Sequence, residues 1–150
     1  MEKKADEIDM ELLQLLEADA KIRIHVLARK MGIPASTVHH RIKRLEKEKF
    51  IDSWTIKKNN KLLGLRMKAH ILAFVDLTML IQLKRTQKDV ANDIKKINGV
   101  ETVDIVTGDA DLLITVRCRD MEEFQNLLLQ RLQSTKGITK TKTMIVVAES

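Results

Sequence analysis

The residues with the clearest chemistry lie between positions 36 and 47 and carry hydrogen-bond donors or positive charge. They are Ser36, Thr37, His39, His40, Arg41, Lys43, Arg44 and Lys47. Such side chains bind base edges and phosphate oxygens. The same stretch places Val38, Ile42 and Leu45 at i, i+4 and i+7, which is one face of a helix. The pattern predicts an amphipathic helix whose polar face suits the major groove of double-stranded DNA.

Position along this helix suggests a division of roles. Ser36, Thr37 and His40 lie near its start and are the better candidates for base edges, whereas Arg44 and Lys47 lie further along and are better placed for phosphate. The sequence leaves open which cation takes which role. His39 and His40 are adjacent, so they project about 100° apart on a helix and cannot chelate one ion. We therefore expect no metal.

The residues before this helix complete a helix-turn-helix. Leu27 and Met31 share one face of a preceding short helix, and Gly32 follows where a positive φ is easy for glycine. Pro34 is tolerated at the first position of the second helix, because its missing N–H would have no partner there. That helix is expected to end near Lys49.

Charge is distributed unevenly over a chain whose net charge is +6. Residues 1–20 hold two lysines against seven acids, a net −5, whereas residues 21–49 hold nine Lys or Arg against two acids, a net +7. The positive charge thus gathers on the predicted helix-turn-helix, and its natural partner is a polyanion.

Composition excludes several other classes. The chain of 150 residues has one Trp, three Phe and no Tyr, which disfavours a single-strand binder built on stacked aromatics. Cys118 is the single cysteine, so an intrachain disulfide or a thiolate cluster is impossible. No phosphate-binding glycine loop or nucleophile elbow occurs, so we expect neither an enzyme nor a cofactor. No apolar leader or membrane-length run occurs, and we expect a cytoplasmic protein.

Two further elements are expected in the N-terminal part. A helix from Asp6 to Glu17, started by Asp6 or Asp9, should support the helix-turn-helix from behind. Residues 53–56 are expected to form a short strand, which would make a winged variant and lead into the linker. We assign 1–56 to a DNA-binding domain and the polar residues 57–66 to a hinge.

Residues 67–150 change periodicity and predict an α+β domain. The expected elements are a strand from 67 to 77, a helix around 90–97, strands at 100–107 and 112–118, a helix around 124–132, and a strand at 139–147. The order βαββαβ is the ferredoxin-like arrangement, with two helices on one face of an antiparallel sheet. The other face is free to pair with a second copy. Whether residues 79–83 begin the first helix early or form a flap stays open.

A second candidate site lies in the turn between the second and third expected strands. Gly108, Asp109 and Asp111 are ordinary turn residues, but a free backbone N–H near Gly108 could also bind a carboxylate, and an aspartate an ammonium group. Thr141 and Thr143 on the last strand are weaker candidates for the same pocket.

The chain resembles the Lrp/AsnC, or feast/famine, transcriptional regulators over nearly its whole length. The matching segments are Asp6-Glu7-Ile8-Asp9, Leu27-Ala28, Gly32-Ile33, Arg41-Ile42-Lys43-Arg44-Leu45-Glu46, Phe50-Ile51, Leu63-Gly64 and Val106-Thr107-Gly108-Asp109-Ala110-Asp111. The resemblance implies an N-terminal DNA-binding domain and a C-terminal domain that forms dimers, and often octamers. It also implies an amino-acid effector held between dimers, with the loop from Thr107 to Asp111 forming part of the pocket.

Three departures from the family pattern bear on function. Pro34 stands where relatives usually carry Ser, His39-His40 replaces a more usual apolar residue and Arg, and residues 78–88 are longer than the expected connection. Operator preference is therefore not expected to transfer. Two rival hypotheses remain: a nucleoid-organising protein of low sequence preference, and an interaction module in which the C-terminal unit regulates an enzyme and the N-terminal helices only dock.

Overall fold

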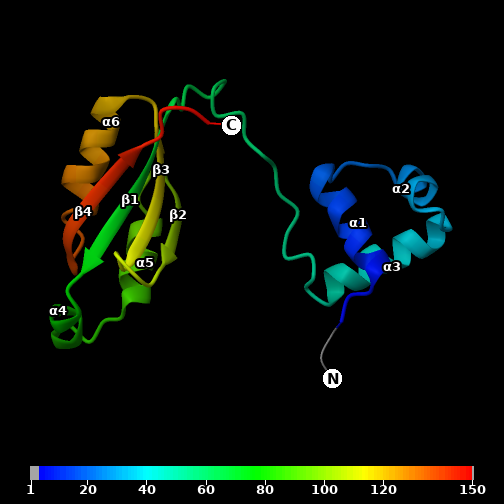
Figure 1. Cartoon of the computed structure of the whole chain (residues 1–150), viewed down its shortest axis with the longest axis horizontal. Coiled ribbons are helices and arrows are strands. Elements are labelled where there is room, and N and C mark those ends of the chain that lie inside the picture. Colours follow the sequence, from blue (N-terminus) through cyan, green and yellow to red (C-terminus); the bar gives the residue numbers. More distant parts are fainter. Residues whose placement is uncertain (1–3, 150) are drawn as a thin grey trace. The chain divides into compact units, whose positions relative to one another are not determined.

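A computed structural model describes residues 4–149. The chain divides into two compact units, one ending at Lys57 and one beginning at Lys58, and the division falls at the start of the expected linker (Figure 1). Each unit has its own hydrophobic core and is described by itself.

The first unit contains the three expected helices: α1 (Glu7–Ala18), α2 (Ile24–Met31) and α3 (Ala35–Lys47). Asp6 caps α1 through a capping box, in which its side chain accepts the Asp9 N–H and the Asp9 side chain accepts the Asp6 N–H. The apolar stripes of all three helices meet in one core, formed by Leu12, Leu16, Leu27, Val38 and Leu45. The helix-turn-helix predicted from periodicity is confirmed.

The turn between α2 and α3 follows the expected backbone chemistry. Gly32 has φ +65°, the left-handed conformation that glycine adopts at little cost. Pro34 is extended and precedes the first helical residue, so α3 begins one residue later than predicted. Lys49, with φ +66°, cannot continue the helix, which ends at Lys47.

The short strand expected at 53–56 is wrong. These residues form neither helix nor strand, and no strand lies elsewhere in the described part of the first unit to pair with them. Apolar alternation alone cannot make a strand without a partner. Instead, the indole Nε1–H of Trp54 donates to Glu46 Oε1 at 2.8 Å and ties this segment to α3.

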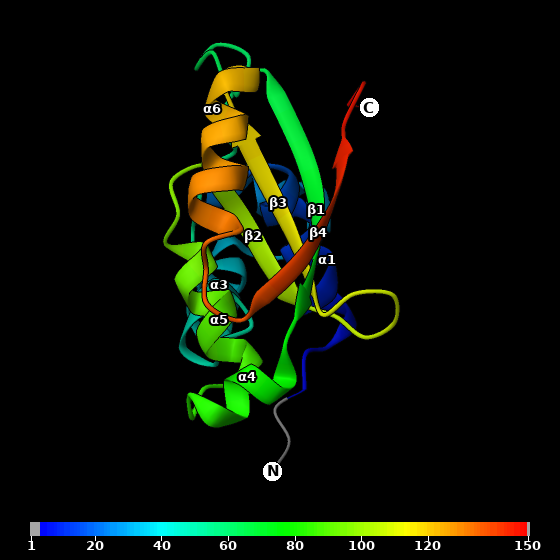
Figure 2. The same ribbon diagram turned by 90° about the vertical axis from the view of Figure 1, so that its left-hand side faces the viewer.

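The second unit is a four-stranded antiparallel sheet in the order β2-β3-β1-β4. The strands are β1 (Met67–Val75), β2 (Val100–Ile105), β3 (Leu112–Cys118) and β4 (Ile138–Ile145). One face carries α5 (Gln87–Lys95) and α6 (Met121–Gln125), which continues as the π-helix η1 (Asn126–Leu132) (Figure 2). The predicted ferredoxin-like arrangement is confirmed: the strand at 112–118 has the predicted bounds, and the other strand and helix ends differ from prediction by at most three residues.

The two faces of this sheet differ in cover. On the helical face, small and branched strand residues such as Ala69 and Ile71 pack against Ile94 and Leu127. In the described part of this unit no helix covers the other face. There His70 Nδ1 lies 3.1 Å from Thr115 Oγ1, and further apolar and aromatic side chains stay half-buried.

The segment 78–88 begins inside a separate short helix, α4 (Leu77–Gln82). The Asp76 side chain caps it, and Leu80 anchors it in the core. Lys84, with φ +52°, ends the turn that follows, and α5 then starts with its own capping box from Thr86 to Asp89. The segment is therefore neither an early start of α5 nor a flap.

Candidate functional site

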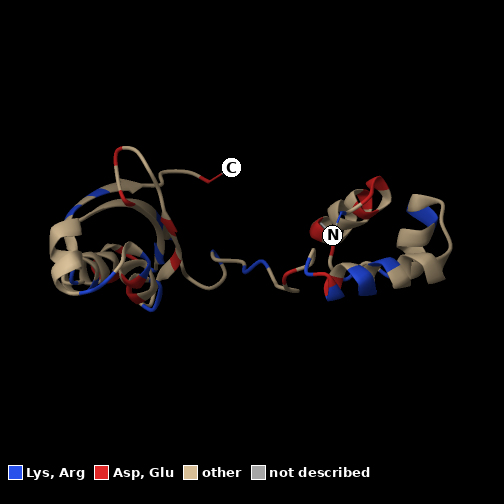
Figure 3. Cartoon of the chain, turned by 90° about the horizontal axis from the view of Figure 1, so that it is seen from below, with Lys and Arg blue, Asp and Glu red and all other residues tan. Residues whose placement is uncertain are grey.

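The polar face of α3 begins with residues that are open to solvent. Val38 and Leu45 are buried against α1 and α2, which fixes how α3 is rotated. Ser36, His39, His40, Lys43 and Lys47 are exposed as a result, and Thr37 is half-buried. Figure 3 shows the basic residues following one another along α3 and the acidic residues gathered on α1. Donors and cations thus share a face that a nucleic acid could approach.

Two arginines of α3 are engaged by α1. Arg41 Nη1 lies 2.7 Å from Asp6 Oδ2 and 2.8 Å from Asp9 Oδ1, and Arg44 Nη2 pairs with Asp9 Oδ2. The Asp9 side chain is fully buried, whereas 21% of the Arg41 side chain and 41% of the Arg44 side chain remain exposed. Asp9 therefore ties the start of α1 to α3, and Arg44 is the arginine that keeps more surface free.

This ion-pair network shifts the pKa values of Asp6 and Arg41. The hydrogen bond from Arg41 lowers the pKa of Asp6 below its usual value, and the bonds from Asp6 and Asp9 raise the pKa of Arg41. Arg41, Arg44, Asp6 and Asp9 contribute no net charge as a group. Part of the positive charge counted in the sequence is therefore neutralised by the N-terminal helix.

The remaining lysines of α3 differ in how free they are. Lys43 Nζ pairs with Glu46 Oε2 at 3.1 Å. The Trp54 indole hydrogen bond and then the Lys43 ammonium lower the pKa of Glu46, so this carboxylate is charged at neutral pH. Lys47 makes no ion pair within residues 4–149. It is the cation of α3 with the fewest competing partners.

His39 and His40 both point outward from α3. Their ring centroids are 6.2 Å apart with an interplanar angle of 71°, which is an edge-to-face arrangement. Over residues 4–149, no group of three or more His, Cys, Asp or Glu side chains could hold a metal.

The second candidate site is the loop between β2 and β3, which extends beyond the ends of the strands (Figure 2). Thr107, Gly108 and Asp109 are exposed, and Gly108 has φ +125°. The loop is closed at its base, where the Val106 N–H donates to the Asp111 carbonyl at 2.9 Å. The exposed tip therefore keeps its backbone and one carboxylate available to a ligand.

Asp111 is part of the fold rather than of the exposed tip. Its Oδ2 accepts the Val75 N–H at 2.8 Å, and its Oδ1 accepts Gln87 Nε2 at 3.1 Å. These bonds attach the loop to the end of β1 and the start of α5. Asp109 is thus the aspartate of the pair that is free to meet an ammonium group.

Thr141 and Thr143 lie on a different strand from the loop. They pair with Ala73 and Ile71 of β1, so they belong to the helical face of β4, and Gln133 Nε2 donates to Thr141 Oγ1 at 3.0 Å. β1 separates β4 from β3, which places the threonines two strand spacings, roughly 10 Å, from the strand that follows the loop. One chain does not bring all six predicted effector residues together.

The sequence interpretation missed one part of the interface. Asp6 and Asp9 were recognised as helix caps, but their role as partners of Arg41 and Arg44 was not. The available signal was the acid-rich start of α1 set against a run of arginines on α3. Periodicity does not say which faces of two helices meet, so the pairing had to come from the structure.

The two units match known families separately. Residues 6–52 match the model of a winged helix-turn-helix DNA-binding domain, and residues 72–150 match the Lrp/AsnC ligand binding domain. The chain belongs to the Lrp/AsnC family. It is thus a transcriptional regulator with a DNA-binding domain and a ligand-binding domain, and not an enzyme.

Individual relatives agree with the Lrp/AsnC assignment. The chain is 41% identical over 140 residues to an uncharacterised HTH-type transcriptional regulator of Pyrococcus furiosus, covering 93% of this chain and 91% of that protein. It is 30% identical over 151 residues to the leucine-responsive regulatory protein of Escherichia coli, covering 98% and 87%. A Neisseria meningitidis transcriptional regulator in complex with L-methionine has the same fold, with a TM-score of 0.87 at 21% identity over 97% and 92% of the chains. Among the described residues of our chain, every helix is too short or too polar to cross a membrane.

Proposed function

We propose that this Lrp/AsnC protein binds specific sequences in double-stranded DNA as a homo-oligomer and answers to an amino acid. The proposal that the protein binds DNA rests on the orientation of α3. Its apolar side is buried in the first unit, and Ser36, His39, His40 and Lys47 are exposed on the other side. A helix presented in this way can lie in a major groove.

The contacts of each side chain suggest its role on DNA. Ser36 and His40, with the half-buried Thr37, are near the start of α3 and are assigned to base edges. Lys47 is assigned to phosphate, together with the exposed part of Arg44. Arg41 is better explained as a positioning residue, since Asp6 and Asp9 take its donors.

Homodimer formation is supported by the uncovered face of the sheet. Leu72, Phe74 and Leu113 are half-buried there, and no described element of the same chain lies over them. A two-fold dimer would present two α3 helices to half-sites roughly 34–36 Å apart. Two helices bound to two half-sites together explain how short recognition helices could bind DNA with both high affinity and high sequence selectivity.

The effector is proposed to bind at the loop of Thr107, Gly108 and Asp109. The exposed backbone near Gly108 suits a carboxylate and Asp109 suits an ammonium group, so an amino acid fits both. The fold relative with L-methionine supports this class of ligand. Because Thr141 and Thr143 lie across β1 from the loop, we infer that neighbouring copies complete the pocket.

DNA binding is tested by selecting genomic fragments and then measuring affinity against excess random duplex. We expect specific binding to exceed random binding by about 10³ or more. A ratio near one would indicate a nucleoid-organising protein instead. The absence of any duplex affinity at low salt would favour the interaction module.

The role of α3 is tested with Lys47→Ala and its matched control Lys88→Ala, which removes the same charge from the exposed side of α5. Loss of one phosphate contact should lower the slope of log affinity against log salt by about one. The control should leave the slope unchanged. Equal slopes for both variants and the parent protein would show that Lys47 does not meet phosphate.

The effector site is tested with Asp109→Ala and the control Glu122→Ala, an exposed carboxylate in the first turn of α6. Each of the twenty amino acids is added to the bound operator. Asp109→Ala should abolish the amino-acid effect and leave operator affinity intact. Loss of both together would contradict a separate sensor loop.

A further inference from the structure

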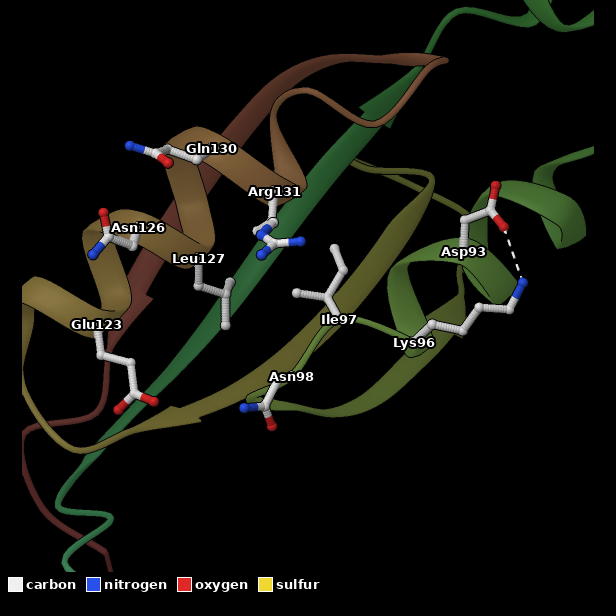
Figure 4. Close-up of a pocket in the computed structure, with 9 residues that line it drawn as sticks. All are labelled: Asp93, Lys96, Ile97, Asn98, Glu123, Asn126, Leu127, Gln130 and Arg131. Carbon is white, nitrogen blue, oxygen red and sulfur yellow. Dashed lines mark hydrogen bonds and ion pairs between the residues drawn. The ribbon is translucent and has the colours of Figure 1, made fainter.

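A cleft of about 710 Å³ lies on the helical face of the second unit, between the end of α5 and the α6–η1 helix (Figure 4). Ile97 and Leu127 form its apolar floor, and Leu127 is 4% exposed. The rim is polar and includes the side-chain amides of Asn98, Asn126 and Gln130. The volume falls within the range of pockets that hold small molecules.

A π-helix forms one wall of this cleft. η1 runs from Asn126 to Leu132, and its backbone bonds join residues five apart instead of four. Asn126, Gln130 and Arg131 of this helix all line the cleft, and Figure 4 shows Arg131 pointing toward Ile97 and Leu127. π-Helices are rare and often occur at functional sites.

The charges around the cleft are unequally satisfied. Asp93 pairs with Arg85 and, at 3.3 Å, with Lys96, while Glu123 accepts both the N–H and Nε–H of Arg119 at 2.7 and 3.2 Å. Both carboxylates are thus already bound to cations of the same chain.

Arg131 differs from those cations. It makes no ion pair within the described range 4–149, and its guanidinium lies beside Ile97 and Leu127 (Figure 4). Arg131 is exposed to solvent, and the charge without an ion-pair partner among the described lining residues is therefore positive. It stands next to an apolar floor, and the three amides can donate hydrogen bonds as well as accept them.

We propose that this cleft binds a short-chain carboxylate that carries an apolar tail and a second oxygen acceptor, such as a 2-oxo acid. Arg131 would take the carboxylate through its fork of N–H donors, an amide of the rim would donate to the second oxygen, and the tail would cover Ile97 and Leu127. An amino acid fits less well, because Asp93 and Glu123 already have cation partners and leave the ammonium group without one.

This site goes beyond the proposed function and differs from the effector loop. Asn98 of the cleft lies just before β2, whereas Gly108 follows the end of that strand. Six strand residues span roughly 20 Å, so the two places lie at opposite ends of β2. The two sites can therefore be tested by separate substitutions, and ligand binding at the cleft is measured without DNA.

The test is isothermal titration calorimetry of the full chain with 4-methyl-2-oxopentanoate, and separately with L-leucine, which has the same carbon skeleton. Arg131→Gln should weaken binding of the oxo acid by about 10-fold or more, since a charge-assisted bond is lost. The control Lys136→Gln removes a nearby exposed cation outside the cleft and should change nothing. Asp109→Ala should also leave oxo-acid binding intact. Far-ultraviolet circular dichroism checks that each variant is folded.

Each other outcome would overturn the proposal. No heat of binding with the oxo acid, or equal affinity in Arg131→Gln and the parent, would remove the cleft as its site. Arg131-dependent binding that is tighter for L-leucine would refute the ligand class. Loss of oxo-acid binding in Asp109→Ala would place the ligand at the loop. The DNA and effector experiments of the proposed function are independent of all four results.

Discussion

Replacing Asp9 with Asn tests whether the start of α1 stabilises the first unit through charge. The substitution keeps an acceptor for the Asp6 N–H and the size of the side chain, but it removes the negative charge that Arg41 and Arg44 share. The unit should lose stability without losing its fold. Asp9 is fully buried, so solvent cannot replace the lost partner there.

The expected loss follows from these contacts. If the amide oxygen faces Arg44 and the Asp6 N–H, the amide NH2 cannot accept from Arg41, so one bond is lost and the other is weakened. These two changes cost about 0.5–1 kcal/mol each, and the helix start loses a favourable charge worth roughly 0.3–1 kcal/mol. Arg41 keeps Asp6 and Arg44 is 41% exposed, so the full cost of breaking a buried pair does not apply. We expect a loss of about 2 kcal/mol.

Urea unfolding followed by tryptophan fluorescence measures this change. Trp54 is the only tryptophan and lies in the first unit, so its emission reports on that unit alone. A loss of about 2 kcal/mol should lower the midpoint by roughly 1–2 M urea. Glu11→Gln, an exposed carboxylate on the same helix, is the control and should shift the midpoint little. Equal midpoints for the two variants would refute the reasoning.

Three further predictions concern the second unit. The hydrogen bond from Arg117 lowers the pKa of Glu149 from its usual value near 4.5 to about 2. The ionised Glu149 side chain therefore stabilises the unit fully above pH 4.5, and this stabilisation is lost as the pH falls toward 2. Acid unfolding of Glu149→Gln should depend less on pH in that window than acid unfolding of the parent protein. Burial raises the pKa of the Cys118 thiol to about 11, so a thiol reagent at pH 8 should react only on unfolding, and rapid labelling of the native protein would contradict this. Gly99→Ala should lower stability by about 2 kcal/mol or more in thermal unfolding, because φ is +92° and the new Cβ would lie 2.8 Å from Leu127 Cδ1; an unchanged midpoint would show that the turn relaxes freely.

Hydrophobic periodicity predicted the helices and strands that bury one face in a core, because burial of one face requires apolar residues at a regular spacing. Val38 and Leu45 set the face of α3, and alternation in β1 and β3 set the sheet, so both domains followed from the sequence. The strand at 53–56 failed because a strand depends on a partner that local pattern cannot supply. The π-helical turn of η1 was missed because Phe124, Leu127, Leu128 and Leu132 lie at i, i+3, i+4 and i+8, which is ordinary α-helical spacing.

The candidate sites were predicted less completely than the fold. The exposed residues Ser36, His39, His40 and Lys47 stand where an amphipathic helix places them. Arg41 and Arg44 contact α1 as well, a long-range pairing that no spacing within α3 reveals. Asp109 and Asp111 read alike in sequence, yet only Asp111 meets a backbone donor of β1. The roles of Asp109 and Asp111 therefore differ because of their hydrogen-bond partners in the folded chain, and the residue type alone does not distinguish them.

The shared carboxylate of Asp9 has a consequence for engineering this regulator. A chimaera that takes only α3 from this protein would place Arg41 and Arg44 in a scaffold whose first helix lacks their carboxylate partner. In the reverse exchange, a foreign α3 would leave the buried Asp9 without its arginine partners. Such a chimaera would lose stability in its DNA-binding unit, whatever its operator specificity. Residues 6–47 should be transplanted as one cassette.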